Sequence, residues 1–231
     1  MEVETRQAAQ GHQGTAERQS LADRAYQQLE SMIVTLQLQP GSIVTEGELG
    51  TLLGIGRTPL REAIQRLAAQ RLVSTLPRRG LTISEINLAD HLGVLETRKA
   101  LDRLIASGAA RRAMPDQRER LKEFAHLMEH AAATENLTEF MRLDRDLDLL
   151  MADASHNAAA SHALGPLHTH CRRFWYWYRH QGDLPKAAEL HEALILAVVE
   201  GNEEAAAAAS DELLAYLEQF TRSAIDIYWT R

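Results

Sequence analysis

One segment, residues 54–80, most constrains the fold because a helical apolar pattern is followed directly by two strand-like stretches. It reads GIGRTPLREAIQRLAAQRLVSTLPRRG. In its first half the apolar residues share one arc at 100° per residue, whereas Thr58 and Arg61 fall on the opposite side. Residues 72–76 and 81–84 look like short strands around a Pro-Arg-Arg-Gly turn. The sequence therefore predicts a helix with one packed and one exposed face, followed by a hairpin.

Two further helices are predicted before this segment. Apolar residues recur three or four apart over residues 21–36, as one buried stripe requires, and Gln-Pro-Gly at 39–41 ends that helix. A short helix is expected over 46–53. Thr58 and Pro59 are expected to open the third helix, as a hydroxyl cap and a first-position proline. Three helices and a hairpin form a winged helix-turn-helix, in which the exposed helix enters the major groove of DNA.

The basic residues of the first part are concentrated in the same segment. The 231-residue chain has a formal net charge of −7, yet residues 1–86 hold nine basic and nine acidic residues, and residues 87–231 hold 16 and 23. Six arginines and one acid lie in residues 54–80. The cationic charge is thus concentrated where a DNA-reading surface is expected, while the acidic second part would by itself repel DNA.

The composition is that of a soluble globular protein, with 45% hydrophobic and 25% charged residues. The single cysteine, Cys171, excludes an internal disulfide framework. The sequence has no charged-then-apolar leader and no run of about 18 apolar residues, so a cytoplasmic location without a membrane partner is expected.

After residue 86 only helical patterns remain, which predicts an all-α helical bundle. The expected helices are 88–112, 116–134, 137–155, 158–180, 185–200 and 203–228. The fold class is therefore mainly α. We expect a disordered tail over 1–18, a winged helix-turn-helix over 19–86, and a helical effector-binding and dimerisation domain over 87–231.

Polar residues interrupt the apolar stripes of this bundle at three places. Asp144 and Asp148 fall in the apolar arc of their helix, whereas Arg145 lies opposite, and His191 and Arg98 lie on the inward arcs of their own helices. Burying carboxylates is costly unless a cation, a hydrogen-bond donor or a metal compensates. Together these residues predict one polar cavity, with Arg98, Asp144, Asp148 and His191 as candidate effector-binding residues.

Two other groups have more ordinary interpretations. His168 and His170 are two apart and point in different directions on a helix, so they are expected on the surface. The aromatic run over 174–178, which follows Arg172 and Arg173, is expected in the core or at an interface, with lining of the effector pocket as the alternative.

The first part resembles the DNA-binding domain of GntR-type bacterial transcription regulators. The resemblance covers residues 20–84 and is most specific in GRTPLREAIQRLAAQRLV and the following RRG. It implies contacts to bases or phosphates by Arg57 and Arg61, and a phosphate contact by Thr58. Gly47 departs from the pattern, since many relatives have an arginine there. The resemblance places the wing tip at Arg78, Arg79 and Gly80, and Arg66 is a further candidate for a phosphate contact.

The second part is similar to the FCD effector domain of the FadR branch of that family, over residues 90–225. Many such domains bind a divalent metal through an Asp, three histidines and a carboxylate effector. The resemblance implies that Asp144 and His191 keep two of these ligands, whereas Asp148 and Leu213 replace two histidines. Asp144, Asp148 and His191 are thus an incomplete candidate metal site. A metal-free pocket, in which Arg98 or His191 pairs with an acidic ligand, is the alternative.

These features predict a ligand-responsive bacterial transcriptional regulator that binds a pseudo-palindromic DNA operator as a homodimer. The expected effector is a small carboxylate. Any cofactor stays unknown beyond a possible divalent metal ion. Two alternatives are a metal-dependent helical-bundle enzyme tethered to DNA and a ligand-independent DNA-binding dimer. The absence of a strong nucleophile and base in 87–231 speaks against the enzyme.

Overall fold

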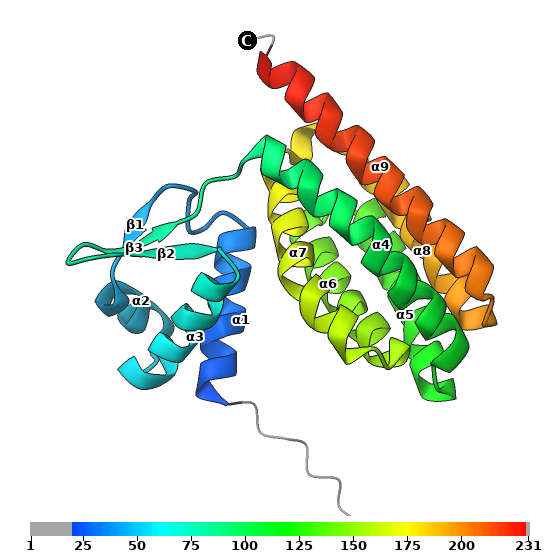
Figure 1. Cartoon of the computed structure of the whole chain (residues 1–231), viewed down its shortest axis with the longest axis horizontal. Helices are drawn as coiled ribbons and strands as arrows, with labels where there is room; N and C mark the ends of the chain where they lie inside the picture. Colours follow the sequence, from blue (N-terminus) through cyan, green and yellow to red (C-terminus); the bar gives the residue numbers. More distant parts are fainter. Residues whose placement is uncertain (1–19, 230–231) are drawn as a thin grey trace, which may run out of the picture.

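The computed structural model describes residues 20–229, with side chains up to residue 225. The tail predicted over residues 1–18 lies outside the described residues. Figure 1 shows two parts, a small winged helix and a larger helical bundle, joined by the segment that leads into α4. The winged helix has the order α1 (Leu21–Val34), β1 (Ile43–Val44), α2 (Glu46–Leu53), α3 (Arg57–Ala69), β2 (Val73–Leu76) and β3 (Gly80–Ile83).

Local capping sets the limits of the first helices. The Ser20 side chain accepts a hydrogen bond from the backbone of Asp23 at the start of α1. Thr45 and Glu48 form a reciprocal capping box at the start of α2. α3 begins at Arg57, two residues earlier than predicted, and Gly56 is its N-cap without a side-chain hydrogen bond. The predicted capping role of Thr58 is therefore wrong, because Thr58 already lies inside the helix.

The three strands form an antiparallel sheet in the order β1-β3-β2. β2 and β3 are the predicted hairpin, in which Val73 pairs with Ile83. β1 was not predicted, because a two-residue strand has no periodicity to recognise; Ile43 pairs with Thr82 of β3. The sheet and the three helices enclose one apolar core, whose fully buried members include Leu29, Ile33, Leu60, Leu67, Leu72 and Ile83.

The second part consists of six long helices and one short 3-10 turn within the described residues. They are α4 (Leu88–Arg112), α5 (Pro115–Ala133), α6 (Leu137–Ser155), α7 (Ala158–Trp177), η1 (Arg179–Gln181), α8 (Leu184–Glu200) and α9 (Glu203–Trp229). The predicted mainly α fold is confirmed: the bundle helix ends coincide with the predicted ones or differ by at most three residues. No helix in the described residues combines the length and apolar character needed to cross a membrane.

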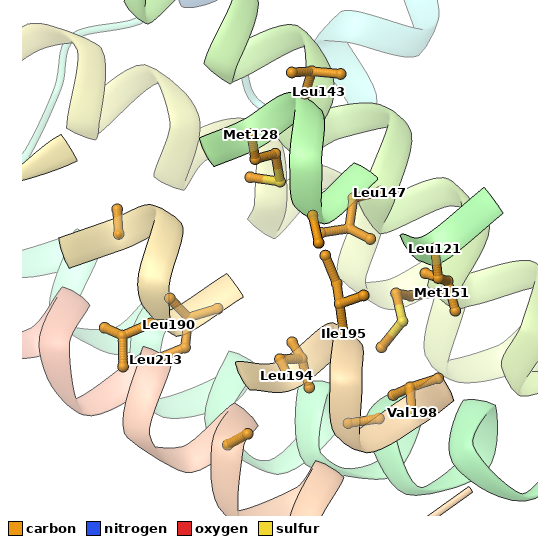
Figure 2. Packing of buried hydrophobic residues seen from close by; sticks show 14 of the residues in the cluster. Leu121, Met128, Leu143, Leu147, Met151, Leu190, Leu194, Ile195, Val198 and Leu213 are labelled. Carbon is orange, nitrogen blue, oxygen red and sulfur yellow. The ribbon is translucent and has the colours of Figure 1, made fainter. Parts of the chain in front are cut away.

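Leucine, methionine and β-branched side chains from α5, α6, α8 and α9 meet in the bundle core. Figure 2 shows Met128, Leu147 and Ile195 from three different helices converging there. Phe174 and Trp175 also belong to this core and are 1% and 5% exposed, as the core interpretation of the aromatic run predicted. The apolar stripes that predict the helices therefore also define how they pack.

Helix α7 lies between the bundle and the winged helix. It packs on α4 and α6 on one side and meets α1 on another, as its position in Figure 1 shows. Two hydrogen bonds go from α7 to backbone carbonyls of the winged helix. His170 Nε2 lies 2.9 Å from the Gln70 oxygen, and Arg173 Nη2 donates to Ser84 O.

Gly54 allows a prediction about the turn between α2 and α3. It caps α2 with a φ of +63°, where a side chain is strained, and a Cβ there would meet no atom within 4 Å. Gly54→Ala should therefore lower the free energy of unfolding by about 1 kcal/mol through backbone strain alone. Gly93→Ala is the matched control: Gly93 is exposed inside α4 with similar open space, and alanine should stabilise by about 0.5–1 kcal/mol. Urea unfolding measures the change in the free energy of unfolding for each variant. A change of the same sign in both variants would contradict the role of backbone strain at Gly54.

Candidate functional site

A cavity of about 820 Å³ opens between the winged helix and the bundle. Its volume is typical of small-molecule sites. The winged helix supplies residues of α1 and α3, including Asp23, Tyr26, Glu30 and Arg66, and the bundle supplies α4, α6, α7, α8 and α9. All four predicted effector-binding residues line it: Arg98, Asp144, Asp148 and His191.

Seven charged side chains of the bundle form one chain of alternating sign along the cavity wall. Arg98 Nε binds Asp102 at 2.8 Å, and the other oxygen of Asp102 lies 2.7 Å from His168 Nε2. His168 Nδ1 lies 3.0 Å from Asp148 Oδ2. The order along the chain is Arg98, Asp102, His168, Asp148, Arg172, Asp144 and His191. Each carboxylate therefore lies between two cationic groups.

The Arg172 guanidinium is at the centre of this chain. Its Nη1 donates to Asp148 Oδ2 at 2.5 Å and to Asp144 Oδ2 at 3.3 Å. Its Nη2 points the other way and donates to Thr169 Oγ1 at 3.3 Å. The Arg172 side chain is 7% exposed, whereas those of Asp144 and Asp148 are 19% and 24% exposed. The arginine thus lies behind the two carboxylates as their buried counter-ion.

Both ring nitrogens of each cavity histidine face an oxygen atom. Nδ1 of His191 lies 2.7 Å from the Ala187 carbonyl, and its Nε2 lies 3.0 Å from Asp144. Burial alone would lower the pKa of His191, but the hydrogen bond and charge of Asp144 raise it overall. Burial also opposes the charge on His168, yet Asp148 and Asp102 raise the pKa of His168 to about 9. Because each nitrogen faces an oxygen acceptor, the surroundings of both rings favour the protonated form.

The residues do not fit the divalent metal that the sequence resemblance implies at Asp144, Asp148 and His191. The hydrogen bond and charge of Asp144 raise the pKa of His191, which favours a proton over a metal at this nitrogen. The Arg172 guanidinium already neutralises the two carboxylates. Leu213, at the expected third histidine, also lines the cavity. Among the described residues no group of three or more His, Cys, Asp or Glu side chains has a metal-binding arrangement.

The cavity lining as a whole is rich in charged and titratable groups of both signs. Its arginines are Arg66, Arg98, Arg145 and Arg172, its histidines are His168 and His191, and its carboxylates are Asp23, Glu30, Asp102, Asp144 and Asp148. The Arg145 side chain is 25% exposed and lies 3.9 Å from Glu30, beyond hydrogen-bonding distance. Arg145 is therefore the least engaged arginine of the cavity and has room for an anionic partner.

The predicted DNA-contacting residues lie within residues 57–80, mostly on the exposed side of the winged helix. Arg57, Thr58 and Arg61 are exposed on α3, and Arg61 forms an exposed ion pair with Glu46 at 2.8 Å. Arg78 and Arg79 are exposed at the turn between β2 and β3, followed by Gly80. The N-terminal half of α3 and the hairpin turn thus present five polar side chains to solvent.

Arg66 differs from this group because it faces the cavity. Its Nη1 lies 2.7 Å from Asp23 Oδ1, and its guanidinium lies 4.2 Å from the centre of the Tyr26 ring. A guanidinium that is both paired and stacked is held in place. Arg66 therefore connects α3 to α1 at the cavity rim.

Sequence reasoning missed four charged residues that the bundle supplies to the site, as well as Asp23 and Glu30 of α1. His168, placed on the surface by sequence, is 8% exposed, and Asp102 and Arg172 were not recognised as members of the site. Arg145, placed opposite the apolar arc, lines the cavity because it faces Glu30 of α1. The sequence did contain a signal for this ion cluster. Two acidic residues, Asp144 and Asp148, lie four apart on one helix, and two basic residues, His168 and Arg172, lie four apart on the next.

The pKa of His168 gives a testable pH dependence. Its value rises from about 6.5 in the unfolded chain to about 9 in the fold, so the stabilisation is complete below pH 6.5 and is lost as the pH rises through 9. The difference corresponds to roughly 3 kcal/mol of unfolding free energy. We expect His168→Gln to flatten the loss of stability between pH 6.5 and 9 in denaturant titrations. His162→Gln, an exposed change on the same helix, should leave the profile of the wild type intact; an unchanged slope in His168→Gln would contradict the assignment.

Comparison with known families and proteins agrees with this architecture. Residues 21–83 match the family described as bacterial regulatory proteins, gntR family, and residues 93–216 match the FCD domain. The chain is 27% identical over 133 residues to the HTH-type transcriptional repressor RspR of Escherichia coli (strain K12), over 58% of each protein. It is 39% identical over 64 residues to an uncharacterized HTH-type transcriptional regulator in an unstable DNA locus of Streptomyces ambofaciens, over 28% of this chain and 27% of the relative.

The chain therefore matches between about a quarter and just over half of the length of these curated relatives. Two solved structures share the fold over most of the chain. E. coli McbR/YncC has a TM-score of 0.75 at 18% identity, covering 91% of this chain and 98% of the other. A putative transcriptional regulator GntR from Rhodococcus sp. RHA1 has a TM-score of 0.68 at 20% identity, covering 88% and 98%.

Proposed function

Because the chain belongs to the GntR family of bacterial transcriptional regulators and carries an FCD domain, we propose that a small carboxylate controls its binding to operator DNA. The operator is a pseudo-palindrome that two copies of the chain read together. The carboxylate binds in the cavity between the winged helix and the bundle. The chain is a regulator and not an enzyme, in keeping with its families and relatives.

One observation carries the proposal of ligand control: a single cavity is lined by both the winged helix and the bundle. A ligand there touches α1 and α3 on one side and the bundle helices on the other. Its affinity must therefore change whenever the two parts move relative to each other. By reciprocity, the ligand then changes the preferred arrangement of the two parts, and with it the affinity for DNA.

The proposed division of labour places DNA reading in residues 19–86 and sensing with dimerisation in 87–231. Arg57 and Arg61 contact bases or phosphates, Thr58 contacts a phosphate, and Arg78 and Arg79 act at the wing tip. Gly80 supports this wing because its φ is +109° and a Cβ there would collide with the Val44 carbonyl. Arg66 contributes through its ion pair with Asp23, which holds α3 to α1 beside the cavity.

The carboxylate class of the effector follows from the charges of the lining. Among the described residues, four arginines line the cavity, and Arg145 has room for a closer partner than Glu30. Arg98, Asp144, Asp148 and His191 form the polar wall that orients such a ligand. A carboxylate gains more from a charge-assisted hydrogen bond to arginine than a neutral group gains from a neutral one.

A ligand-independent dimer is the second candidate. The alternating chain from Arg98 to His191 satisfies its own charges, so the bundle needs no ligand to neutralise its buried groups. This candidate predicts that no small carboxylate stabilises the protein. Both candidates predict the same DNA contacts, so mutations of the DNA-binding residues do not distinguish them.

Two measurements on the full chain test the proposal. Fluorescence anisotropy with DNA fragments from upstream of its own gene should find one fragment that binds more tightly than unrelated DNA of equal length. A thermal-shift panel of benzoate, citrate, succinate, lactate and 3-phenylpropionate should find a stabilising compound, since saturation at about 100 times Kd adds roughly 2.7 kcal/mol. That compound should also change the anisotropy titration. Stabilisation without any effect on DNA affinity would refute ligand control.

A further inference from the structure

Glu30 belongs to the winged helix, yet its carboxylate is buried against the bundle. It lies on α1, and the residue is 5% exposed. Thr169 Oγ1 donates to Glu30 Oε1 at 2.5 Å. Arg172 Nη2 lies 3.9 Å from the same oxygen, and Arg145 Nε lies 3.9 Å from the other. Both oxygens of this α1 carboxylate therefore face cations of the bundle.

Arg145 and Arg172 are placed to bind an anion more closely than they bind Glu30. At 3.9 Å neither one forms a hydrogen bond to Glu30, although both attract it. Both line the cavity, and so does Glu30 itself. Arg172 is held from behind by Asp144 and Asp148, so its Nη2 edge stays directed at Thr169 and Glu30. The carboxylate of Glu30 thus lies where a ligand carboxylate would find two arginines and a hydroxyl group.

We propose that Glu30 is a tethered competitor of the effector, occupying the position that the carboxylate of the ligand takes between Arg145 and Arg172. This inference rests on the proposed function, since it assumes a carboxylate effector in this cavity. When the ligand pairs with the two arginines, Glu30 becomes a buried anion without a cation. Such a charge is too costly to keep buried, so Glu30 moves out to water.

The displacement of Glu30 carries α1 with it, because Glu30 is part of that helix. α1 packs on α3 in the core of the winged helix, so the reading helix follows. The other polar contacts from α7 to the winged helix end on the carbonyls of Gln70 and Ser84. The donors of these two bonds, His170 and Arg173, do not line the cavity, so a ligand there acts on the Glu30 contact selectively.

Acetate provides a test that needs no knowledge of the effector. In the full chain, Glu30→Ala leaves an empty position of carboxylate size beside Arg145, Arg172 and Thr169. Sodium acetate should then raise the Tm of this variant by about 3 °C over sodium chloride at equal ionic strength. The wild type should not show this difference. The matched control is Asp23→Ala, which removes another α1 carboxylate of the same cavity, one that pairs with Arg66 of its own domain. Equal responses of all three proteins to acetate would overturn the proposal.

Glu30→Gln provides the second test, with a carboxylate from the panel that binds the wild type. The amide keeps the shape and the hydrogen bond from Thr169 but gives up the charge that competes. Isothermal titration should show about ten-fold tighter binding to Glu30→Gln. Asp23→Asn should stay within about two-fold of the wild type. Unchanged affinity in Glu30→Gln would refute competition while leaving ligand control intact. Failure of every carboxylate to bind the wild type refutes the proposed effector class instead, and the acetate test still decides whether the Glu30 position accepts a free carboxylate.

Discussion

Arg172→Met should lower the free energy of unfolding by about 3–5 kcal/mol, because it removes one partner from a buried ion cluster. The thioether fills much of the same volume, so the loss is mainly electrostatic. Asp144 and Asp148 would then face each other across the cavity wall without the guanidinium that now contacts both. Denaturant unfolding at pH 7, followed by circular dichroism, measures this loss directly.

The loss of unfolding free energy in Arg172→Met, relative to the wild type, should become smaller as the pH falls. Burial alone would raise the pKa of Asp144, but the hydrogen bond from His191 and the charge of Arg172 hold it below the usual range. Without Arg172 the pKa of Asp144 rises, so the folded variant takes up a proton that the folded wild type does not. The gap between the two proteins should thus be smaller at pH 5 than at pH 7. Arg142→Met, at an exposed arginine of α6 paired with Glu139 and Asp146, should cost less than about 1 kcal/mol; a similar cost in both variants would contradict the central role of Arg172.

Arg57→Ala combined with Arg61→Ala should weaken specific DNA binding about 10²- to 10⁴-fold, since each arginine contact to a guanine edge contributes roughly 1–3 kcal/mol. Both side chains are exposed on α3, so their removal should leave the Tm almost unchanged. Fluorescence anisotropy against the wild-type operator fragment and an unrelated fragment separates the two kinds of contact. Contacts to bases lower the ratio of specific to nonspecific affinity, whereas contacts to phosphates lower both affinities together.

The matched control removes the same charge from the other part of the chain. Arg120 and Arg142 are exposed arginines of α5 and α6. Their double alanine variant should bind the operator within about three-fold of the wild type, since distant surface charges act only through the screened field. If both double variants lose affinity equally, the effect is one of net charge, and α3 is not the reading helix.

The phase of single helices was readable from the sequence. The apolar arc of α3 predicted a packed face of five residues. Four of them, Leu60, Ala63, Ile64 and Leu67, are the buried residues of that helix, and the fifth, Ala68, is half-buried. The inward arcs of the bundle predicted that Arg98, Asp144, Asp148 and His191 share a cavity, and all four line it. These predictions succeed because a period of 3.6 residues fixes which side chains share a face.

The side chains that the sequence misplaced are those whose surroundings depend on which helices pack together. His168 and His170 point in different directions, as predicted, but each direction ends at another buried surface: the cavity for His168 and the Gln70 carbonyl for His170. Arg145 lies away from the apolar arc of α6 and still lines the cavity, because a helix of the other domain covers it. A helical period identifies the buried face, but it does not identify a second face that the winged helix buries.

One turn of α7 has a consequence for how such a regulator can change over evolutionary time. His168 and Arg172 contact the charged wall of the cavity, while Thr169, His170 and Arg173 contact the winged helix. A substitution that adapts this turn to a new metabolite therefore also disturbs the attachment of the winged helix. New ligand specificity at α7 would need compensating changes in α1, and regulators of this type should diversify more freely through α8 and α9.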